Sequence, residues 1–205
     1  MLAMGLVASA GWLALALVQS TGSAVPSLAA YSVAAGAVMM HQGWPRLVGL
    51  LRVSAAGLAW GLGVGAALLA LTYGLYPVVR WVEPAIAAEV QGLYRQLDLA
   101  NPAMALPLVW VVVVGEELLW RGILLEAVAT ERRWNATRLR QIAMGSAVYA
   151  LAQAGFGSVL LVAVAFGCGI VWSALRLHTG QLIAPVASHL IWSSFVLWLV
   201  PLPAP

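Results

Sequence analysis

Two adjacent glutamates and an arginine stand inside an apolar run of the chain, VVVVGEELLWRGILLEAV at residues 111–128. An ionisable side chain at the centre of a bilayer costs at least ~2.5–3.5 kcal/mol, so such groups usually face a cavity and serve a function. In a helix Arg121 lies one turn beyond Glu117, where the two charges neutralise each other. Glu116 points about 100° away and lacks that partner. Because two close carboxylates resist double ionisation, Glu116 is a candidate base that takes a proton from water.

Two other apolar runs also carry polar residues at helical spacing. His189 has Pro185 four residues before it and Ser193 four residues after it, so the three share one helix face. Pro185 removes a backbone hydrogen bond and is expected to bend that helix. Tyr149 and Gln153 lie one turn apart and give another helix a polar stripe. The alternatives are a structural ion pair for Glu117 and Arg121, and a hydrogen-bonded packing role for His189.

The elements that carry these residues are expected to span a membrane. The chain has 205 residues, of which 63% are hydrophobic and 8% charged, whereas soluble domains are about 45–50% apolar. Since a spanning helix needs roughly 20 mostly apolar residues, we predict an all-α polytopic membrane bundle of about seven or eight transmembrane helices, in one domain over residues 1–205. The expected spans are residues 2–19, 25–41, 53–79, 103–129, 140–156, 157–175 and 182–200.

The arginines predict how the bundle is oriented, because cytoplasmic loops collect basic residues. With a cytoplasmic N-terminus, seven arginines fall on the cytoplasmic side: Arg46, Arg52, Arg132, Arg133, Arg138, Arg140 and Arg176. The opposite side keeps Arg80 and Arg95, together with acidic residues. We expect an integral protein of a bacterial inner membrane, since all ten basic residues are arginine. They are too scattered to bind nucleic acid, so the lipid bilayer is the expected partner.

Two further stretches have a structural interpretation. Residues 80–101 alternate charges with Ile86, Val90, Leu93 and Leu97 at helical spacing, which predicts an amphipathic helix on the membrane surface. It would act as a connector or guide a substrate into the bundle. Gly57, Gly61 and Gly65 recur every fourth residue and predict close packing of two membrane helices.

The motifs described above resemble those of the CPBP family of intramembrane proteases, also called the Abi or CAAX prenyl endopeptidase family. EELLWRG at 116–122 matches the family's EExxxR signature, and LRLHTGQLIAPVASHLIWS at 175–193 looks like its last motif region. The resemblance covers residues 110–195. It implies a bundle of about eight helices. It also implies that Glu116 activates the attacking water with support from Glu117 and Arg121, and that His189 helps to hold the oxyanion.

Two positions depart from the family pattern. Gln153 stands where the second motif, FxxxH, has histidine, and Ser193 replaces the last-motif Asn or Asp. Gln153 can still orient a water, because an amide both donates and accepts hydrogen bonds, and Ser193 can still donate one hydrogen bond to an oxyanion. No cofactor is expected. A zinc ion, if one were bound, would take Glu116 and His189 as ligands, within a set that Glu117 could complete.

The sequence therefore predicts a glutamate-dependent intramembrane endopeptidase with a membrane-anchored peptide or protein as its substrate. Glu116, Glu117, Arg121, Gln153, His189 and Ser193 form the predicted site. One alternative is a degenerate family member that binds membrane segments, confers immunity or acts as a scaffold without cutting. A small transporter that relays protons through Glu116 and His189 is a further alternative, although the inverted repeats typical of transporters are not evident in the sequence.

Overall fold

Helices form every regular element in the part of the chain that the computed structural model describes, which comprises residues 2–18, 24–97, 102–130 and 137–203. The elements are α1 (Leu2–Val18), α2 (Val25–Leu47), α3 (Ala55–Val82), α4 (Ala85–Leu97), α5 (Pro102–Glu116), η1 (Glu117–Leu124), α6 (Leu125–Thr130), α7 (Arg138–Gln153), η2 (Ala154–Phe156), α8 (Val159–Thr179), α9 (Ile183–Ser194) and η3 (Phe195–Leu199). The predicted all-α class is confirmed.

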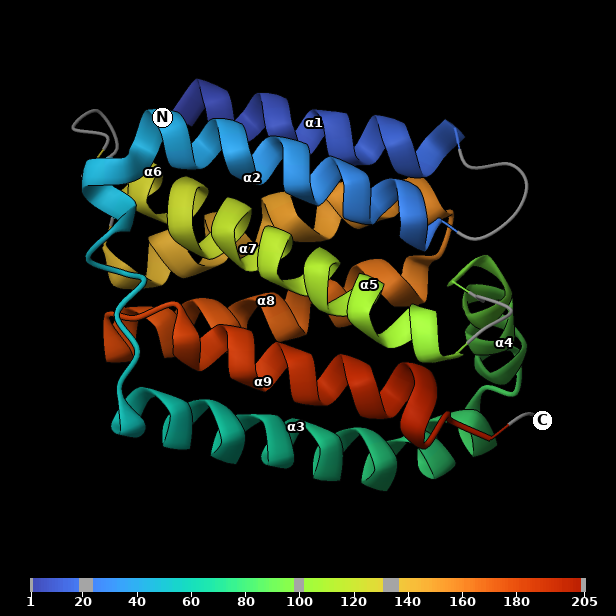
Figure 1. Ribbon diagram of the computed structural model, residues 1–205. Coiled ribbons are helices and arrows are strands. Elements are labelled where there is room, and N and C mark those ends of the chain that lie inside the picture. The colour runs from blue at the N-terminus through green and yellow to red at the C-terminus, as the bar shows by residue number, and fades with distance from the viewer. Residues whose placement is uncertain (1, 19–23, 98–101, 131–136, 204–205) are drawn as a thin grey trace.

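The long helices pack side by side, and α4 lies across one end of them (Figure 1). The continuous rod α5–η1–α6 contacts α2, α1 and α9, while α7 packs along α8 and α3 packs along α9. Residues of the two sequence motifs are therefore carried by neighbouring elements, since η1 and α9 both contact α5.

Apolar helices long enough to cross a membrane are α3 and α8 among the described residues, and α1 and the segment Ile183–Leu199 are apolar but shorter. The outer face of α3 exposes large apolar side chains, including Trp60, Leu71 and Trp81. An apolar face of this kind suits lipid and is unfavourable in water. These apolar helices support the prediction of a membrane protein, and the count of about seven or eight crossings stays a prediction.

Three predicted boundaries were wrong. Helix α2 continues to Leu47 instead of ending near residue 41, because an apolar run marks the stretch within hydrocarbon and not the end of the helix. Helix α3 continues to Val82, so the amphipathic helix begins at Ala85 and not at residue 80. Glu83, which precedes Pro84, has left the helical region (φ −134°, ψ 89°), as expected for a residue before proline. The predicted end of this helix, residues 98–101, lies outside the described residues.

The glycines of α3 pack against α9, as predicted. Gly57, Gly61 and Gly65 are all buried. A Cβ atom at Gly61 would lie 2.8 Å from Cβ of Ala187, and one at Gly65 would lie 3.1 Å from Cα of Ser188. Because Ser188 precedes His189, this close approach helps to fix the position of the histidine.

Candidate active site

The two glutamates lie where the helix changes its hydrogen-bonding pattern. Glu116 is the last residue of α5, and Glu117 is the first of η1, a π-helical segment. The widened turns end where the amide of Leu125 donates to the carbonyl of Trp120. π-Helical turns inside α-helices are frequent at functional sites. The apolar pattern of residues 111–128 gives no sign of this change, so sequence reasoning missed it.

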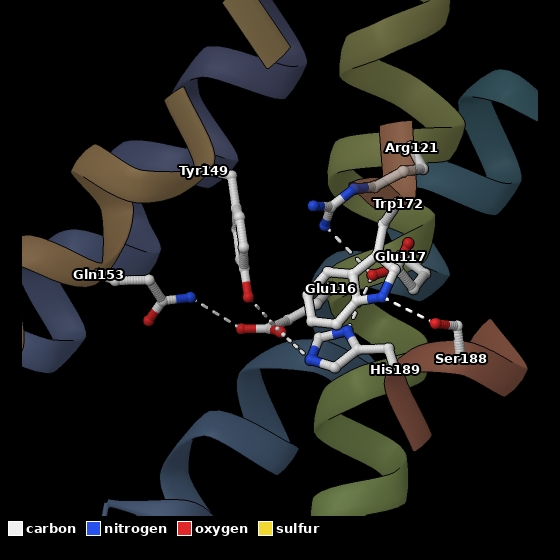
Figure 2. Close-up of polar contacts among 8 residues, drawn as sticks. All are labelled: Glu116, Glu117, Arg121, Tyr149, Gln153, Trp172, Ser188 and His189. Carbon is white, nitrogen blue, oxygen red and sulfur yellow. Dashed lines mark hydrogen bonds and ion pairs between the residues drawn. The ribbon is translucent and has the colours of Figure 1, made fainter. Parts of the chain in front are cut away.

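Glu116 is held by the polar stripe of α7 (Figure 2). The amide nitrogen of Gln153 donates to Oε1 at 2.9 Å, and the hydroxyl of Tyr149 donates to Oε2 at 3.4 Å. Nε2 of His189 lies 3.6 Å from Oε2. The glutamate side chain is only 7% exposed. Residues of α7 and α9 therefore converge on this carboxylate of α5.

Glu117 has a separate set of partners. Its Oε1 accepts from Nη1 of Arg121 at 3.1 Å and lies 2.8 Å from Nδ1 of His189. The glutamate is fully buried and the arginine is 1% exposed. A carboxylate at Nδ1 favours the proton on that nitrogen, so in a neutral ring Nε2 keeps its lone pair. Glu117 thus orients the imidazole, whose Nε2 faces Glu116.

Aromatic rings enclose the arginine and the histidine. Trp172 stacks on His189 with ring centroids 3.7 Å apart, and its indole N–H donates to Ser188 at 3.1 Å. The guanidinium carbon of Arg121 lies 4.4 Å from the ring centroid of Tyr149 and 5.3 Å from that of Trp172. These faces attract the guanidinium, of which Nε and Nη2 have no hydrogen-bond partner among the described residues. Sequence reasoning missed Trp172 and Ser188.

A cavity of about 520 Å³ opens beside this cluster. Glu116, Gln153 and His189 line it, whereas Glu117 and Arg121 do not. Most of its other walls are apolar side chains of α3, α4, α5 and α8. The apolar stripe of α4 also faces this cavity: Ile86, Val90, Leu93 and Leu97 all line it. The sequence predicted that this stripe rests on the membrane surface and did not predict that it lines the cavity. Amphipathicity identifies an apolar face but not what covers it.

The structure bears differently on the predictions for Ser193 and Pro185, both in α9. Ser193 is buried, lies one turn beyond His189 and lines the same cavity. Pro185 does not bend the middle of a helix, because α9 begins at Ile183 and the proline stands in its first turn. There the missing amide hydrogen has no partner to lose, so the predicted bend was wrong.

One bound proton balances the charges of the four residues Glu116, Glu117, Arg121 and His189. Arg121 and Glu117 form an ion pair, so one proton on either Glu116 or His189 makes the four-residue cluster neutral. A neutral cluster is strongly favoured where the surroundings are buried and apolar. The proton has two alternative positions, 3.6 Å apart and both at the cavity wall. Such an arrangement can accept and return a proton.

The donor set does not suit a tightly held zinc ion. Within the described ranges, no group of three His, Cys, Asp or Glu side chains is arranged to hold a metal ion. Nδ1 of His189 and Oε1 of Glu117 are engaged with each other, which leaves Glu116 and Nε2 of His189 as ligands facing the cavity. Catalytic zinc sites use about three protein ligands. No step is therefore assigned to a metal.

Fold and site together define a helical membrane protein with a buried carboxylate–imidazole pair at the end of an apolar cavity. Residues 98–195 match the family model described as Rce1-like, type II CAAX prenyl endopeptidase Rce1-like. The match confirms the family resemblance found in the two motifs, and the family that this model describes is one of proteases. No curated protein and no solved structure matched the chain.

Proposed function

We propose that the protein is an intramembrane endopeptidase in which Glu116 activates a water that attacks the scissile peptide bond of a membrane-anchored substrate. One observation carries the proposal: Oε2 of Glu116 and Nε2 of His189 lie 3.6 Å apart at the wall of the cavity. A separation slightly too long for a direct hydrogen bond suits two groups that share a water.

The reaction needs one proton to move twice. Glu116 accepts a proton from the water as the oxygen of the water bonds to the scissile carbonyl carbon. The carbonyl oxygen becomes an oxyanion, which accepts hydrogen bonds from Nε2–H of a protonated His189 and from the hydroxyl of Ser193. Protonated Glu116 then gives its proton to the amide nitrogen as the C–N bond breaks. The oxyanion reforms a carbonyl as that bond breaks, which leaves a carboxylic acid and an amine, and the acid then gives its proton to the amine.

Three surrounding groups position the reacting pair in this mechanism. Glu117 and Arg121 hold the imidazole through Nδ1, and Gln153 fixes the rotamer of Glu116 through Oε1. The direct contact differs from the predicted role of Gln153, which was to orient the water. It is consistent with replacement of the family's histidine by an amide, because both side chains donate an N–H.

The substrate is expected to bring an apolar anchor into the cavity, since the walls are mostly apolar. A prenylated or otherwise membrane-tethered peptide has that chemistry. Arg52 lies in the connection between α2 and α3, Arg138 is the first residue of α7, and Arg176 lies in the last turn of α8. The start of α1 and the connection between α2 and α3 lie at the same end of the bundle (Figure 1), which favours a cytoplasmic N-terminus. With that orientation in a bacterial inner membrane, α4 and the adjoining part of the cavity face away from the cytoplasm.

The test uses the purified full chain in lipid nanodiscs. A peptide with a farnesylated cysteine near its C-terminus and the same peptide without the lipid are incubated with the protein, and mass spectrometry identifies the products. We expect one internal cleavage of the anchored peptide and little cleavage of the other. A Glu116→Gln preparation controls for contaminating proteases. Equal cleavage by that preparation would reject the proposal, and binding without any cleavage would favour the degenerate-protease alternative.

A further inference from the structure

A short segment of the chain itself enters the mouth of the cavity. After η3 ends at Leu199, residues 200–203 run on towards the C-terminus past the end of α3 and beside α4 (Figure 1). They belong to no helix. Side chains of α3 and α4 hold their backbone groups instead. Tyr73 donates to the carbonyl of residue 200 at 2.6 Å, and Tyr76 donates to the carbonyl of residue 203 at 2.9 Å.

Leu202 lies between these two contacts, and its backbone amide and its backbone carbonyl are both hydrogen-bonded to side chains of α4. The amide of Leu202 donates to the hydroxyl of Tyr94 at 2.9 Å, and its carbonyl accepts from the side chain of Gln91 at 3.4 Å. The leucine side chain is 8% exposed and lines the cavity that also contains Glu116 and His189. Backbone groups held by fixed polar side chains, with an apolar side chain in a pocket, are how proteins bind extended peptides.

Contacts outside residues 200–203 hold α4 and Tyr94 at this mouth. Glu89 ties α4 to the start of α8 by accepting from the hydroxyl of Ser158 at 2.6 Å and from the amide of Leu160 at 3.1 Å. Tyr94 donates to the carbonyl of Val196 at 2.8 Å. Burial raises the pKa of Tyr94 to about 12, so its hydroxyl stays protonated and donates to one backbone group while accepting from another.

We propose that Tyr73, Tyr76, Gln91 and Tyr94 form a subsite for the extended backbone of an incoming peptide, and that residues 200–203 occupy it as an internal competitor. The subsite recognises main-chain groups and one apolar side chain, so its ligand is an extended apolar peptide segment. The inference rests on the proposed peptidase function for the fate of that ligand. A tethered segment competes at an effective concentration in the range of about 1 mM, so loosening it should strengthen peptide binding.

The test measures binding and not cleavage. A fluorescein-labelled, farnesylated peptide is titrated into purified full chain that carries Glu116→Gln, and fluorescence anisotropy gives its Kd. Leu202→Ala removes side-chain atoms from the cavity and is expected to lower the Kd by about tenfold, because each buried methylene contributes to docking of the competitor. Val200→Ala is the matched control, since Val200 is 50% exposed, and should leave the Kd unchanged.

A second change separates the subsite from the competitor. With Leu202→Ala present, Tyr94→Phe removes a hydrogen bond to the bound peptide and should raise the Kd by about fivefold. A photoreactive version of the peptide should crosslink to residues 91–94 more strongly in the Leu202→Ala protein than in protein with wild-type residues 200–203. Equal Kd values for Leu202→Ala and Val200→Ala, or crosslinks confined to other helices, would overturn the inference. Either result can arise while cleavage is intact, and absent cleavage leaves the binding test valid.

Discussion

Glu116 and Glu117 are neighbours in the chain, yet they have separate partners, and the proposed mechanism gives them separate roles. Glu116 faces the cavity and is held by α7, whereas Glu117 faces the interior and binds Arg121 and His189. In the proposed mechanism Glu116 exchanges a proton, whereas Glu117 is paired with Arg121. This difference explains why a single arginine suffices for two glutamates.

Replacing Gln153 tests how Glu116 is held. Gln153→His keeps an N–H donor within reach of Oε1, so the rate constant for cleavage should stay within about tenfold of wild type. Gln153→Leu removes the donor and should lower the rate constant by about 10²-fold. Single-turnover kinetics with the anchored peptide measure both values. A collapse of activity in the histidine variant would contradict the assignment of α7 to this site.

Breaking the ion pair behind His189 should cost stability as well as activity. Glu117→Gln leaves a buried arginine without its charged partner, and removal of one partner of a buried pair typically costs about 3–5 kcal/mol. Arg121→Met in the same chain removes the orphaned charge, so thermal unfolding in detergent should return towards the wild-type Tm. Activity should stay low in both variants, because the acceptor at Nδ1 of His189 has lost the negative charge that stabilises the protonated imidazole. Full activity in the double variant would refute this positioning role.

At the scale of the elements, the close packing of α3 on α9 fixes the position of His189 relative to the neighbouring helices. A methyl group at Gly61 would meet the carbonyl oxygen of Ala184 and lie 2.8 Å from Cβ of Ala187. Overpacking of this kind typically costs about 1–3 kcal/mol, so Gly61→Ala should lower both the Tm and the rate of cleavage.

The same helix provides the control for that change. A methyl group at Gly63 would have no heavy atom of a neighbouring element within 4 Å, and alanine favours a helix over glycine by roughly 0.5–1 kcal/mol. Gly63→Ala should therefore keep or slightly raise the Tm and leave cleavage unchanged. If both variants lose the same stability, the loss reflects the chemistry of glycine replacement and not the contact with α9.

Local spacing allowed some of this arrangement to be predicted from the sequence. The Glu117–Arg121 pair follows from i, i+4 geometry, and the glycine face of α3 follows from its four-residue period. The π-helical turn could not be predicted, because an apolar run is compatible with either hydrogen-bonding pattern. Trp172 could not be assigned either, since stacking on His189 depends on how α8 meets α9. Residues 200–203 have no sequence periodicity that would predict their contacts with α3 and α4.

For the whole molecule, the alternating helices predict which connections face each side of the membrane. Cysteine introduced at Leu51 lies in the connection between α2 and α3, and cysteine at Glu83 lies between α3 and α4. Cys168 is the single native cysteine and is replaced by serine in both. In intact cells a membrane-impermeant maleimide should label position 83, and position 51 only after permeabilisation. The reverse pattern would contradict the cytoplasmic N-terminus.

The role of Glu116 as the base that activates the water is tested most directly by the single-turnover rate constant of Glu116→Gln, compared with that of Glu126→Gln. Both changes neutralise a glutamate of the same continuous rod, but Glu126 pairs with Arg176 away from the cavity. With the anchored peptide saturating, we expect Glu116→Gln to lose about 10²–10⁴-fold in rate while its Kd for the peptide is unchanged. Glu126→Gln should cleave at close to the wild-type rate. A Glu116→Gln rate constant equal to that of wild type would contradict the claim that this carboxylate activates the water.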